Sequence, residues 1–246
     1  MARFYARYGT SFTEITHAMK IKHIFQIVIF IPLFIVLGIN IAAFGTILFY
    51  RAFYPHKTVF MHARTPDKIP LQYQPVEYEN ISIYLKKAII AAEDAKFAQH
   101  SGFDWQGIQN AAKKNKKTGQ IKAGGSTISQ QTAKNLFLIP NRSFVRKSEE
   151  AVMTAMLEAT TDKERILALY LNIIEWGEGL FGAEAAAQYY YKKSAADLTQ
   201  HEAAQLASMP TRPVYYQQHL DNKRLKNKTK IIKKRMQNAT LPQGDD

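Results

Sequence analysis

Residues 82–102 read SIYLKKAIIAAEDAKFAQHSG, and this stretch decides the fold. Ser82 is a favourable helix N-cap, and the apolar residues behind it recur at helical spacing. We expect a helix that runs from Ser82 to about Phe97. Residues four apart lie on one face of a helix, so Ile89, Glu93 and Phe97 are predicted to share a stripe.

The chemistry of this stretch centres on Glu93. A carboxylate between Ile89 and Phe97 on an inward-facing stripe would be partly withdrawn from water, which suits it to accepting a proton. Glu93 is therefore our candidate general base, with Asp94 beside it and His100 near the end of the same stripe. An ion-paired glutamate at a helix edge has the same spacing, so that interpretation stays open.

Helical signals continue toward the C-terminus. N-cap or capping-box residues begin further helices at Asp104, Ser126, Ser143, Thr161 and Thr199. The alternation of polar and apolar residues that marks strands is nearly missing, and four prolines interrupt residues 51–80. The sequence predicts a mainly α fold with at most a small sheet in that proline-rich segment.

A stretch without acidic residues separates Asp104 from Glu149. Its nine basic residues are Lys113, Lys114, Lys116, Lys117, Lys122, Lys134, Arg142, Arg146 and Lys147. Such an imbalance favours an anionic partner. Within this stretch, Gly124-Gly125-Ser126-Thr127 forms a flexible turn before a helix N-terminus, whose free amides and dipole favour phosphate. The same four residues also suit an ordinary loop and helix cap.

Two helices in this stretch present polar groups at helical spacing. Thr127, Gln131 and Lys134 would place a hydroxyl, an amide and an ammonium on one face, which suits a diphosphate and a sugar. No Gly-Lys-Ser or Gly-Lys-Thr follows the glycines, so nucleotide hydrolysis is disfavoured. Arg146 and Glu150 combine a cation for phosphate oxygens with a second carboxylate, although an exposed ion pair has the same spacing.

The N-terminal segment carries a long apolar run. From Ile24 to Tyr50 no residue is formally charged, and these 27 residues would span roughly 40 Å as a helix, more than the ~30 Å hydrocarbon core of a bilayer. A cleaved signal peptide has a shorter apolar region and a small-residue cleavage site. Slightly more basic residues precede the run than follow it, which slightly favours a cytoplasmic N-terminus. We therefore expect a cytoplasmic tail at 1–23, a transmembrane anchor at 24–50, a linker at 51–80 and a globular domain at 81–246.

The composition limits the remaining classes. The chain has 246 residues, a formal net charge of +13 and no cysteine, which excludes a disulfide scaffold, a thiol nucleophile and a thiolate zinc site. The charge fits nucleic acid, acidic lipid headgroups or a phosphorylated substrate, and composition alone does not choose among them. Eight of the thirteen residues in 223–235 are basic, which fits a helix or a solvated charge run, with anionic lipid as the alternative partner.

Four stretches resemble, in order, the motifs of the peptidoglycan glycosyltransferases, glycosyltransferase family 51. EDAKFAQHSG at 93–102 resembles E-D-x-x-F-x-x-H-x-G, and GGSTISQQTAKN at 124–135 resembles G-G-S-T-I-x-Q-Q-x-x-K-N. RKSEE at 146–150 is similar to R-K-x-x-E, and KERILALYLN at 163–172 to the fourth motif. Ala168 stands where the fourth motif often has Glu, and Thr132 where the second usually has an aliphatic residue.

The resemblance covers roughly residues 80–215 and includes the glycosyltransferase domain of class A penicillin-binding proteins. No penicillin-binding domain follows, so we expect a monofunctional enzyme with its glycosyltransferase domain at 81–246. The resemblance implies a lysozyme-like α fold behind one membrane helix. It also implies a bacterial inner-membrane location, with the catalytic domain in the periplasm.

The implied activity is glycan polymerisation from lipid II. The growing chain leaves undecaprenyl diphosphate and joins the GlcNAc 4-hydroxyl of lipid II in a β-1,4 bond, with inversion. Glu93 is the implied base, and Glu150 is the implied second catalytic carboxylate. The implied substrate-binding residues are Asp94, His100, Ser126, Thr127, Gln131, Lys134, Asn135 and Arg146.

The expected partners are lipid II, the nascent glycan strand and membrane lipid, with cell-division or elongation proteins as further candidates and no nucleic acid. The residues assign no cofactor, and a divalent cation, Mg²⁺ or Mn²⁺, is the one candidate. Two other functions stay open. One is a lytic transglycosylase or muramidase that cuts glycan with a single glutamate, and the other is a membrane-tethered anion-binding protein.

Overall fold

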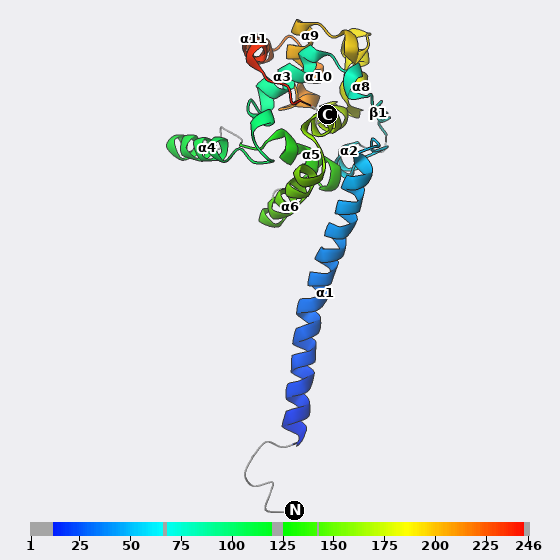
Figure 1. The fold of residues 1–246 in the computed structure, drawn as a ribbon, viewed down its shortest axis with the longest axis vertical. Helices are drawn as coiled ribbons and strands as arrows, with labels where there is room; N and C mark the ends of the chain where they lie inside the picture. The colour runs from blue at the N-terminus through cyan, green and yellow to red at the C-terminus, as the bar shows by residue number, and fades with distance from the viewer. Residues whose placement is uncertain (1–11, 66–67, 120–124, 142, 244–246) are drawn as a thin grey trace, which may run out of the picture. The chain divides into compact units, whose positions relative to one another are not determined.

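The computed structural model describes residues 12–65, 68–119, 125–141 and 143–243, and it divides into two units, residues 1–45 and 46–246. Helix α1 (Phe12–Tyr50) supplies the described part of the first unit (Figure 1). Its segment Phe25–Tyr50 has a mean hydropathy of 2.8 and is long enough to cross a membrane. It is the one such helix in the described residues, and membrane anchors and signal sequences share this property.

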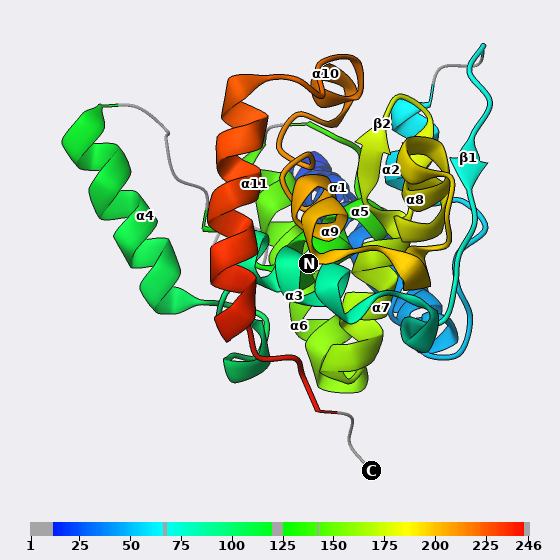
Figure 2. The ribbon, with the colours of Figure 1, turned by 90° about the horizontal axis from the view of Figure 1, so that it is seen from above.

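Helices also dominate the second unit, which confirms the prediction of a mainly α chain. They are α2 (Val59–Arg64), α3 (Ile83–Glu93), α4 (Trp105–Thr118), α5 (Ile128–Phe137), α6 (Phe144–Thr160), α7 (Lys163–Ile173), α8 (Ala183–Tyr191), α9 (Gln200–Leu206), α10 (Pro213–Gln218) and α11 (Lys223–Arg235). Short 3-10 helices lie at Tyr78–Asn80, Phe97–Gln99, Ala195–Asp197 and Met236–Asn238. Helix α5 packs against α2, α6 and α7, while α3 packs against α9 and α11 (Figure 2).

Local capping signals set most helix starts, but α3 is shorter than predicted. It ends at Glu93 rather than near Phe97, because Asp94 leaves helical geometry with φ −159° and its carboxylate binds other elements. Phe97 therefore lies in a separate 3-10 turn and does not continue the stripe of α3. The N-caps of α5 and α7 each lie one residue beyond the predicted ones, at Thr127 and Asp162. The predicted caps of α4, α6 and α9 are Asp104, Ser143 and Thr199, as expected.

A small three-stranded sheet has the order β1-β3-β2. Strand β1 (Gln72–Tyr73) lies in the proline-rich segment and pairs in parallel with β3 (Leu180–Phe181). Strand β2 (Glu175–Gly177) pairs antiparallel with β3 and lies outside the segment where a sheet was expected. The hairpin turn needs glycine at Gly179, where φ is +68° and a Cβ would lie 2.8 Å from a side-chain carbon of Ile69.

The core joins α3, α7, α8 and α9. Its largest fully buried side chains are Trp176, Tyr170 and Phe97, and burial of each such apolar side chain contributes about 1.5–3 kcal/mol. A second cluster contains Met61, Leu136, Ile173 and Phe181, which come from α2, α5, α7 and β3. Helix α5 is thus held firmly between its neighbours, and it carries the polar residues of the second motif.

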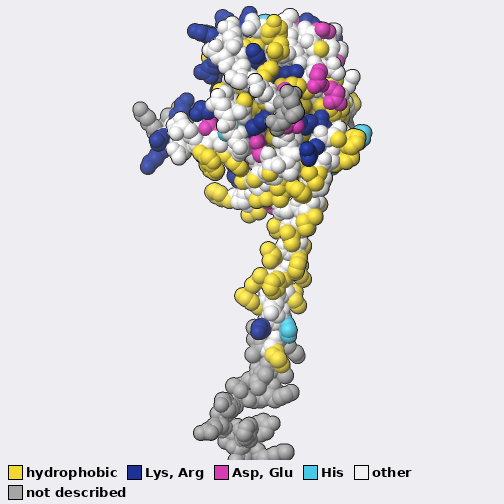
Figure 3. Space-filling model, viewed as in Figure 1, with side chains coloured by type: hydrophobic (Ala, Val, Ile, Leu, Met, Phe, Trp, Pro, Cys, Tyr) yellow, Lys and Arg dark blue, Asp and Glu magenta, His cyan; other side chains and the backbone are white. Residues whose placement is uncertain are grey.

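The basic segment 223–235 forms helix α11. Leu225, Thr229 and Ile232 are its buried face, and most of its lysines and arginines remain exposed. Figure 3 shows Lys and Arg side chains gathered over α4 and α11. The segment is therefore a helix whose outer faces are charged.

Candidate active site

Glu93 is the last residue of α3 and is half-buried. A helix C-terminus disfavours a negative charge, so this carboxylate depends on donors and cations from other elements. Gln131 Nε2 of α5 donates to Glu93 Oε2 at 3.1 Å. Lys134 of α5 and Lys228 of α11 lie close enough to interact electrostatically with Glu93. Glu93 Oε1 accepts no hydrogen bond from the described residues, which leaves this oxygen for a substrate.

A pocket of about 210 Å³ opens beside Glu93. Its walls come from the end of α3, the start of α4 and the loop before α5, with lining residues Glu93, Asp94, Ala95, Lys96, Asp104, Gly107, Gly125, Ser126 and Thr127. Gly125 allows the loop to approach α4 closely, because a Cβ there would lie 3.1 Å from Ile108 Cα. Polar groups from three elements therefore meet at one opening, which we call the Glu93 pocket.

Asp94 joins the first motif to the start of α5. Its buried carboxylate accepts from the Ile128 backbone N–H at 3.0 Å and from His100 Nε2 at 3.1 Å. Asp94 and His100 were expected to bind substrate; in the structure they bind each other, and Asp94 also binds α5. Asp94 also lines the Glu93 pocket, whereas His100 does not.

The N-terminus of α5 is occupied largely by protein groups. Thr127 and Gln130 form a capping box: the Thr127 hydroxyl accepts from the Gln130 N–H at 3.1 Å, and Gln130 Oε1 accepts from the Thr127 N–H at 3.0 Å. With Asp94 on the Ile128 N–H, these contacts correct the expectation that the first amides of α5 are free for phosphate. Gly124, Lys122 and Arg142 lie outside the described residues.

Lys134 extends from the last turn of α5. Burial lowers its pKa below the ordinary value of lysine, while the Glu150 carboxylate opposes the shift. Its ammonium lies 5.6 Å from the centre of the Phe60 ring, and it makes no hydrogen bond or ion pair with a described residue. The neighbouring Asn135 is buried, and its Oδ1 has no hydrogen-bond partner among the described residues. Both groups therefore retain capacity to bind a ligand.

Glu150 is buried on α6 between two cations. Arg146 Nη1 donates to Glu150 Oε2 at 2.7 Å, and Lys147 Nζ pairs with Glu150 Oε1. Lys147 Nζ also donates to Ser126 Oγ at 3.4 Å, which links α6 to the loop of the second motif. Arg146 and Lys147 both interact electrostatically with Lys134. We call Lys134, Arg146 and Lys147 the cation cluster.

The family described as Transglycosylase matches residues 63–237, more than half of the chain. The chain belongs to the transglycosylase family. A biosynthetic peptidoglycan transglycosylase of Neisseria gonorrhoeae is 53% identical over 221 residues, which cover 87% of this chain and 95% of that protein. Proteins of the same description are 52% identical in Neisseria meningitidis, over 87% of this chain and 95% of theirs, and 51% identical in Laribacter hongkongensis, over 81% and 90%.

In this transglycosylase the structure brings together most of the predicted site residues. Glu93 and Gln131 are hydrogen-bonded, Lys134 interacts with both Glu93 and Glu150, and Ser126 and Thr127 line the Glu93 pocket. Lys134 and Arg146 are not among the residues that line that pocket. The cation cluster therefore does not form the wall of the Glu93 pocket. Its Lys134 is close enough to Glu93 for the two charges to interact.

Sequence reasoning missed Lys228. Burial lowers the pKa of this α11 lysine, the Glu93 carboxylate opposes the shift, and Nζ donates to the Ser208 carbonyl at 3.3 Å. The available signal was the spacing of Leu225 and Ile232, which indicates a helix with an inward face and places Lys228 on its flank. If the basic segment is treated as one solvated tail, nothing indicates that Lys228 lies near Glu93.

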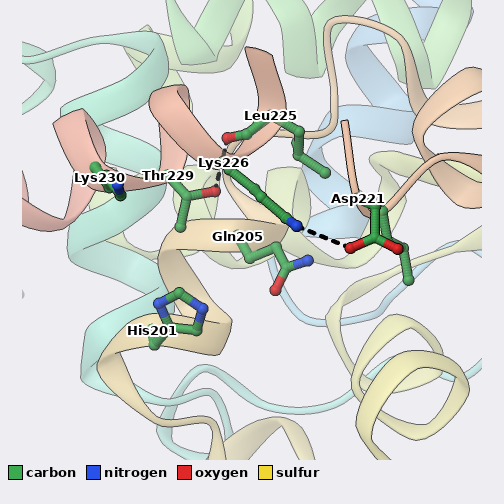
Figure 4. A pocket seen from close by; sticks show the side chains of 8 residues that line it. His201, Gln205, Asp221, Leu225, Lys226, Thr229 and Lys230 are labelled. Carbon is green, nitrogen blue, oxygen red and sulfur yellow. Dashed lines mark hydrogen bonds and ion pairs between the residues drawn. The ribbon is translucent and has the colours of Figure 1, made fainter. Parts of the chain in front are cut away.

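The transglycosylase has a larger pocket elsewhere, of about 390 Å³, between α9 and α11 (Figure 4). It is lined by His201, Gln205, Leu220, Asp221, Leu225, Lys226, Thr229 and Lys230. Lys226 pairs with Asp221 at 2.8 Å, and Gln205 Oε1 accepts from the Tyr191 hydroxyl at 3.2 Å. None of the four motifs contributes a residue, and we call it the α9/α11 pocket.

Proposed function

We propose that this transglycosylase polymerises the glycan strands of peptidoglycan by moving the growing chain from undecaprenyl diphosphate to the GlcNAc 4-hydroxyl of lipid II. The coarser statement, a peptidoglycan glycosyltransferase of cell-wall synthesis, follows from its family and its relatives. One observation carries the finer proposal. The half-buried Glu93 carboxylate has one oxygen held by Gln131 and the other free, beside a pocket and within electrostatic reach of Lys134.

The bond-forming step uses Glu93 as a general base. Glu93 Oε1 accepts the proton of the acceptor 4-hydroxyl while the hydroxyl oxygen attacks C1 of the donor sugar from the face opposite the diphosphate. The C1–O bond to diphosphate breaks, its electron pair leaves with the diphosphate, and the new β-1,4 bond has inverted configuration. A positioned base contributes about 10²–10⁴-fold to such a step.

The leaving diphosphate needs cations more than a protonating acid, because it departs as a stable anion. Lys134 is suited to this role, since its desolvated ammonium has no ion pair among the described residues. Arg146 adds a guanidinium that matches phosphate oxygens, and Lys147 a further charge. We assign the diphosphate to the cation cluster, with Ser126, Thr127 and Asn135 as neighbouring polar contacts.

In this proposal Glu150 holds Arg146 and Lys147 in position. Both of its oxygens are engaged, one by Arg146 and one by Lys147, so it is better placed to fix their positions than to transfer a proton. Asp94 has a comparable place in the first motif, where it holds His100 and the start of α5. The Glu93 pocket and the cation cluster thus each contain a carboxylate that positions other groups.

The described residues do not form a site that would hold a divalent cation by protein ligands alone. Among the described residues no three His, Asp or Glu side chains come together as a metal would require, and the oxygens of Asp94 and Glu150 already face their own donors. No step of the proposed reaction is routed through Mg²⁺ or Mn²⁺. The cation cluster supplies the charge that the diphosphate needs.

We further propose that α1 anchors the enzyme in the bacterial inner membrane, with residues 1–23 cytoplasmic, 24–50 spanning, 51–80 as linker and 81–246 as a periplasmic catalytic domain. The single long apolar helix supports an anchor, because it is longer than a signal peptide requires. An anchor keeps the site near a lipid-linked substrate. Lipid II, the nascent strand and membrane lipid are the proposed partners, and cell-division or elongation proteins are candidates.

The proposed activity is tested with labelled lipid II and the purified full-length protein in detergent. We expect labelled glycan polymer that lengthens with time and is degraded by a muramidase. Purified sacculi, offered in parallel, should remain intact. Sacculi that are cut while lipid II stays monomeric would assign a lytic activity instead.

A further inference from the structure

We propose that Tyr170 is a positioning residue for the general base, acting through Gln131. The inference rests on the proposed function, because it assigns Glu93 as the base. Tyr170 lies on α7 in the fourth motif, Gln131 on α5 in the second and Glu93 on α3 in the first. One chain of side chains therefore connects three motif segments.

Each hydrogen bond in this chain is donated toward Glu93. The Tyr170 hydroxyl donates to Gln131 Oε1 at 3.4 Å, and Gln131 Nε2 donates to Glu93 Oε2 at 3.1 Å. Tyr170 is fully buried, so its hydroxyl has no water to replace the amide as a partner. Burial raises the pKa of Tyr170 well above its usual value, and the nearby Glu93 and Asp94 carboxylates add to the effect. The hydroxyl therefore keeps its proton and remains a donor.

This arrangement fixes which way the Gln131 amide points. A glutamine side chain has an acceptor oxygen on one side and donor N–H groups on the other. If the amide of Gln131 turned over, its oxygen would face the Glu93 carboxylate, which would lose its donor. Its NH₂ could then donate to the Tyr170 oxygen, but the buried Tyr170 O–H would lose its acceptor. Tyr170 thus keeps an N–H donor directed at Glu93.

The consequence concerns the two oxygens of Glu93. Gln131 holds Oε2, and Oε1 has no partner among the described residues. A carboxylate held at one oxygen has less rotational freedom, so the other oxygen is presented to the pocket in a defined direction. Tyr170 contributes by orienting the donor, without touching the substrate or the reacting atoms.

Tyr170→Phe tests the proposal, because it removes only the hydroxyl. We expect kcat for lipid II polymerisation to fall about tenfold, with KM changed less than about twofold, since an orienting contact acts on the chemical step more than on binding. Tyr191→Phe is the matched control. Its partly buried hydroxyl also donates to a glutamine oxygen, Gln205 Oε1 at 3.2 Å, and this glutamine lines the α9/α11 pocket. Equal effects of the two variants on kcat would overturn the proposal.

A double-mutant cycle separates positioning from a general structural effect. Gln131→Ala alone should lower kcat by at least as much as Tyr170→Phe. In the Gln131→Ala background, Tyr170→Phe should have no further effect, because the hydrogen-bonded route from Tyr170 to Glu93 is gone. Additive losses in kcat would overturn the proposal. So would an unchanged kcat in Gln131→Ala, which also decides the matter if Tyr170→Phe fails to fold.

A measurement independent of turnover distinguishes failure of this inference from failure of the proposed function. The side-chain amide resonance of Gln131, assigned by its loss in Gln131→Ala, is followed by ¹H–¹⁵N NMR in the full-length protein. It should move in Tyr170→Phe and in Glu93→Ala and stay unchanged in Tyr191→Phe. If the chemical shift of this resonance is unchanged in Tyr170→Phe, the inference is overturned. If it moves as expected while Glu93→Gln keeps full turnover, the contacts stand and the base assignment falls.

Discussion

The Glu93 pocket and the α9/α11 pocket differ both in volume and in the hydrogen-bonding state of their polar groups. The α9/α11 pocket is the larger, about 390 Å³ against about 210 Å³. In it Asp221 pairs with Lys226, Gln205 Oε1 accepts from the Tyr191 hydroxyl, and the Thr229 hydroxyl donates to the Leu225 carbonyl. The Glu93 pocket has a carboxylate with a free oxygen, near a desolvated lysine without an ion pair among the described residues. Unused bonding capacity, rather than volume, is the reason for proposing the Glu93 pocket as the active site.

The largest expected difference between the two pockets is the change in kcat when a carboxylate of each is replaced by its amide. Glu93→Gln keeps the shape of the side chain but removes the base, so kcat for lipid II polymerisation should fall by about 10³-fold while lipid II still binds. Asp221→Asn makes the same chemical change in the α9/α11 pocket and should leave kcat unchanged. Radiolabelled polymer formation and a binding assay check both variants. Comparable losses from the two changes would remove the distinction between the pockets.

The next effect concerns the lysines. Lys134→Ala removes a desolvated cation from the cation cluster, and we expect kcat/KM to fall by about 10²-fold, as for loss of one preorganised group that stabilises the leaving charge. Lys226→Ala, at the exposed ion pair of the α9/α11 pocket, is the control and should keep kcat/KM. An unchanged rate in Lys134→Ala would place the diphosphate outside the cation cluster.

A smaller effect should appear in the pH dependence. Burial lowers the pKa of Lys134, so in the free enzyme its ammonium loses its proton, as pH rises, earlier than that of an ordinary lysine. The alkaline decline of kcat/KM, which reports the free enzyme, should therefore begin at lower pH in the wild type than in Lys134→Arg, because arginine stays charged. Lys226→Arg is the control. Identical alkaline limbs in wild type and Lys134→Arg would contradict the role of this ammonium.

The smallest effect is expected in the α9/α11 pocket. Gln205→Ala removes the nearer of the two acceptors of the Tyr191 hydroxyl, so the free energy of unfolding should decrease by about 1 kcal/mol. Polymerisation should stay within about twofold of wild type, because no residue of the four motifs lines this pocket. Thermal unfolding and the polymerisation assay are read on the same preparation. A large loss of activity at unchanged stability would give this pocket a function.

The sequence predicted those parts of the site that depend on spacing along one helix. Thr127, Gln131 and Lys134 share α5, and Arg146 contacts Glu150 one turn away, as their positions indicated. The end of α3 was predicted wrongly, since apolar residues continue to Phe97 and nothing local signals that Asp94 turns away to bind Ile128. A tertiary hydrogen bond ended the helix against its periodicity.

Contacts between distant segments were beyond such reasoning. Lys228 approaches Glu93 because Leu225 and Ile232 pack α11 onto the core, and Tyr170 meets Gln131 because α7 packs against α5. Neither position carries a local signal of its partner. The occupation of the α5 N-terminus by Asp94 was hidden for the same reason, since the free amides predicted from the glycine-rich turn are bound by a residue from another motif.

The most direct test of the account is a structure of the Glu93→Gln variant bound to lipid II, which stops the reaction before bond formation. The account predicts the acceptor 4-hydroxyl within hydrogen-bond distance of the residue 93 side chain, about 2.6–3.2 Å, with diphosphate oxygens of the donor chain or its analogue on Lys134 and Arg146. A 4-hydroxyl bound away from residue 93, or a saccharide seated in the α9/α11 pocket, would contradict it.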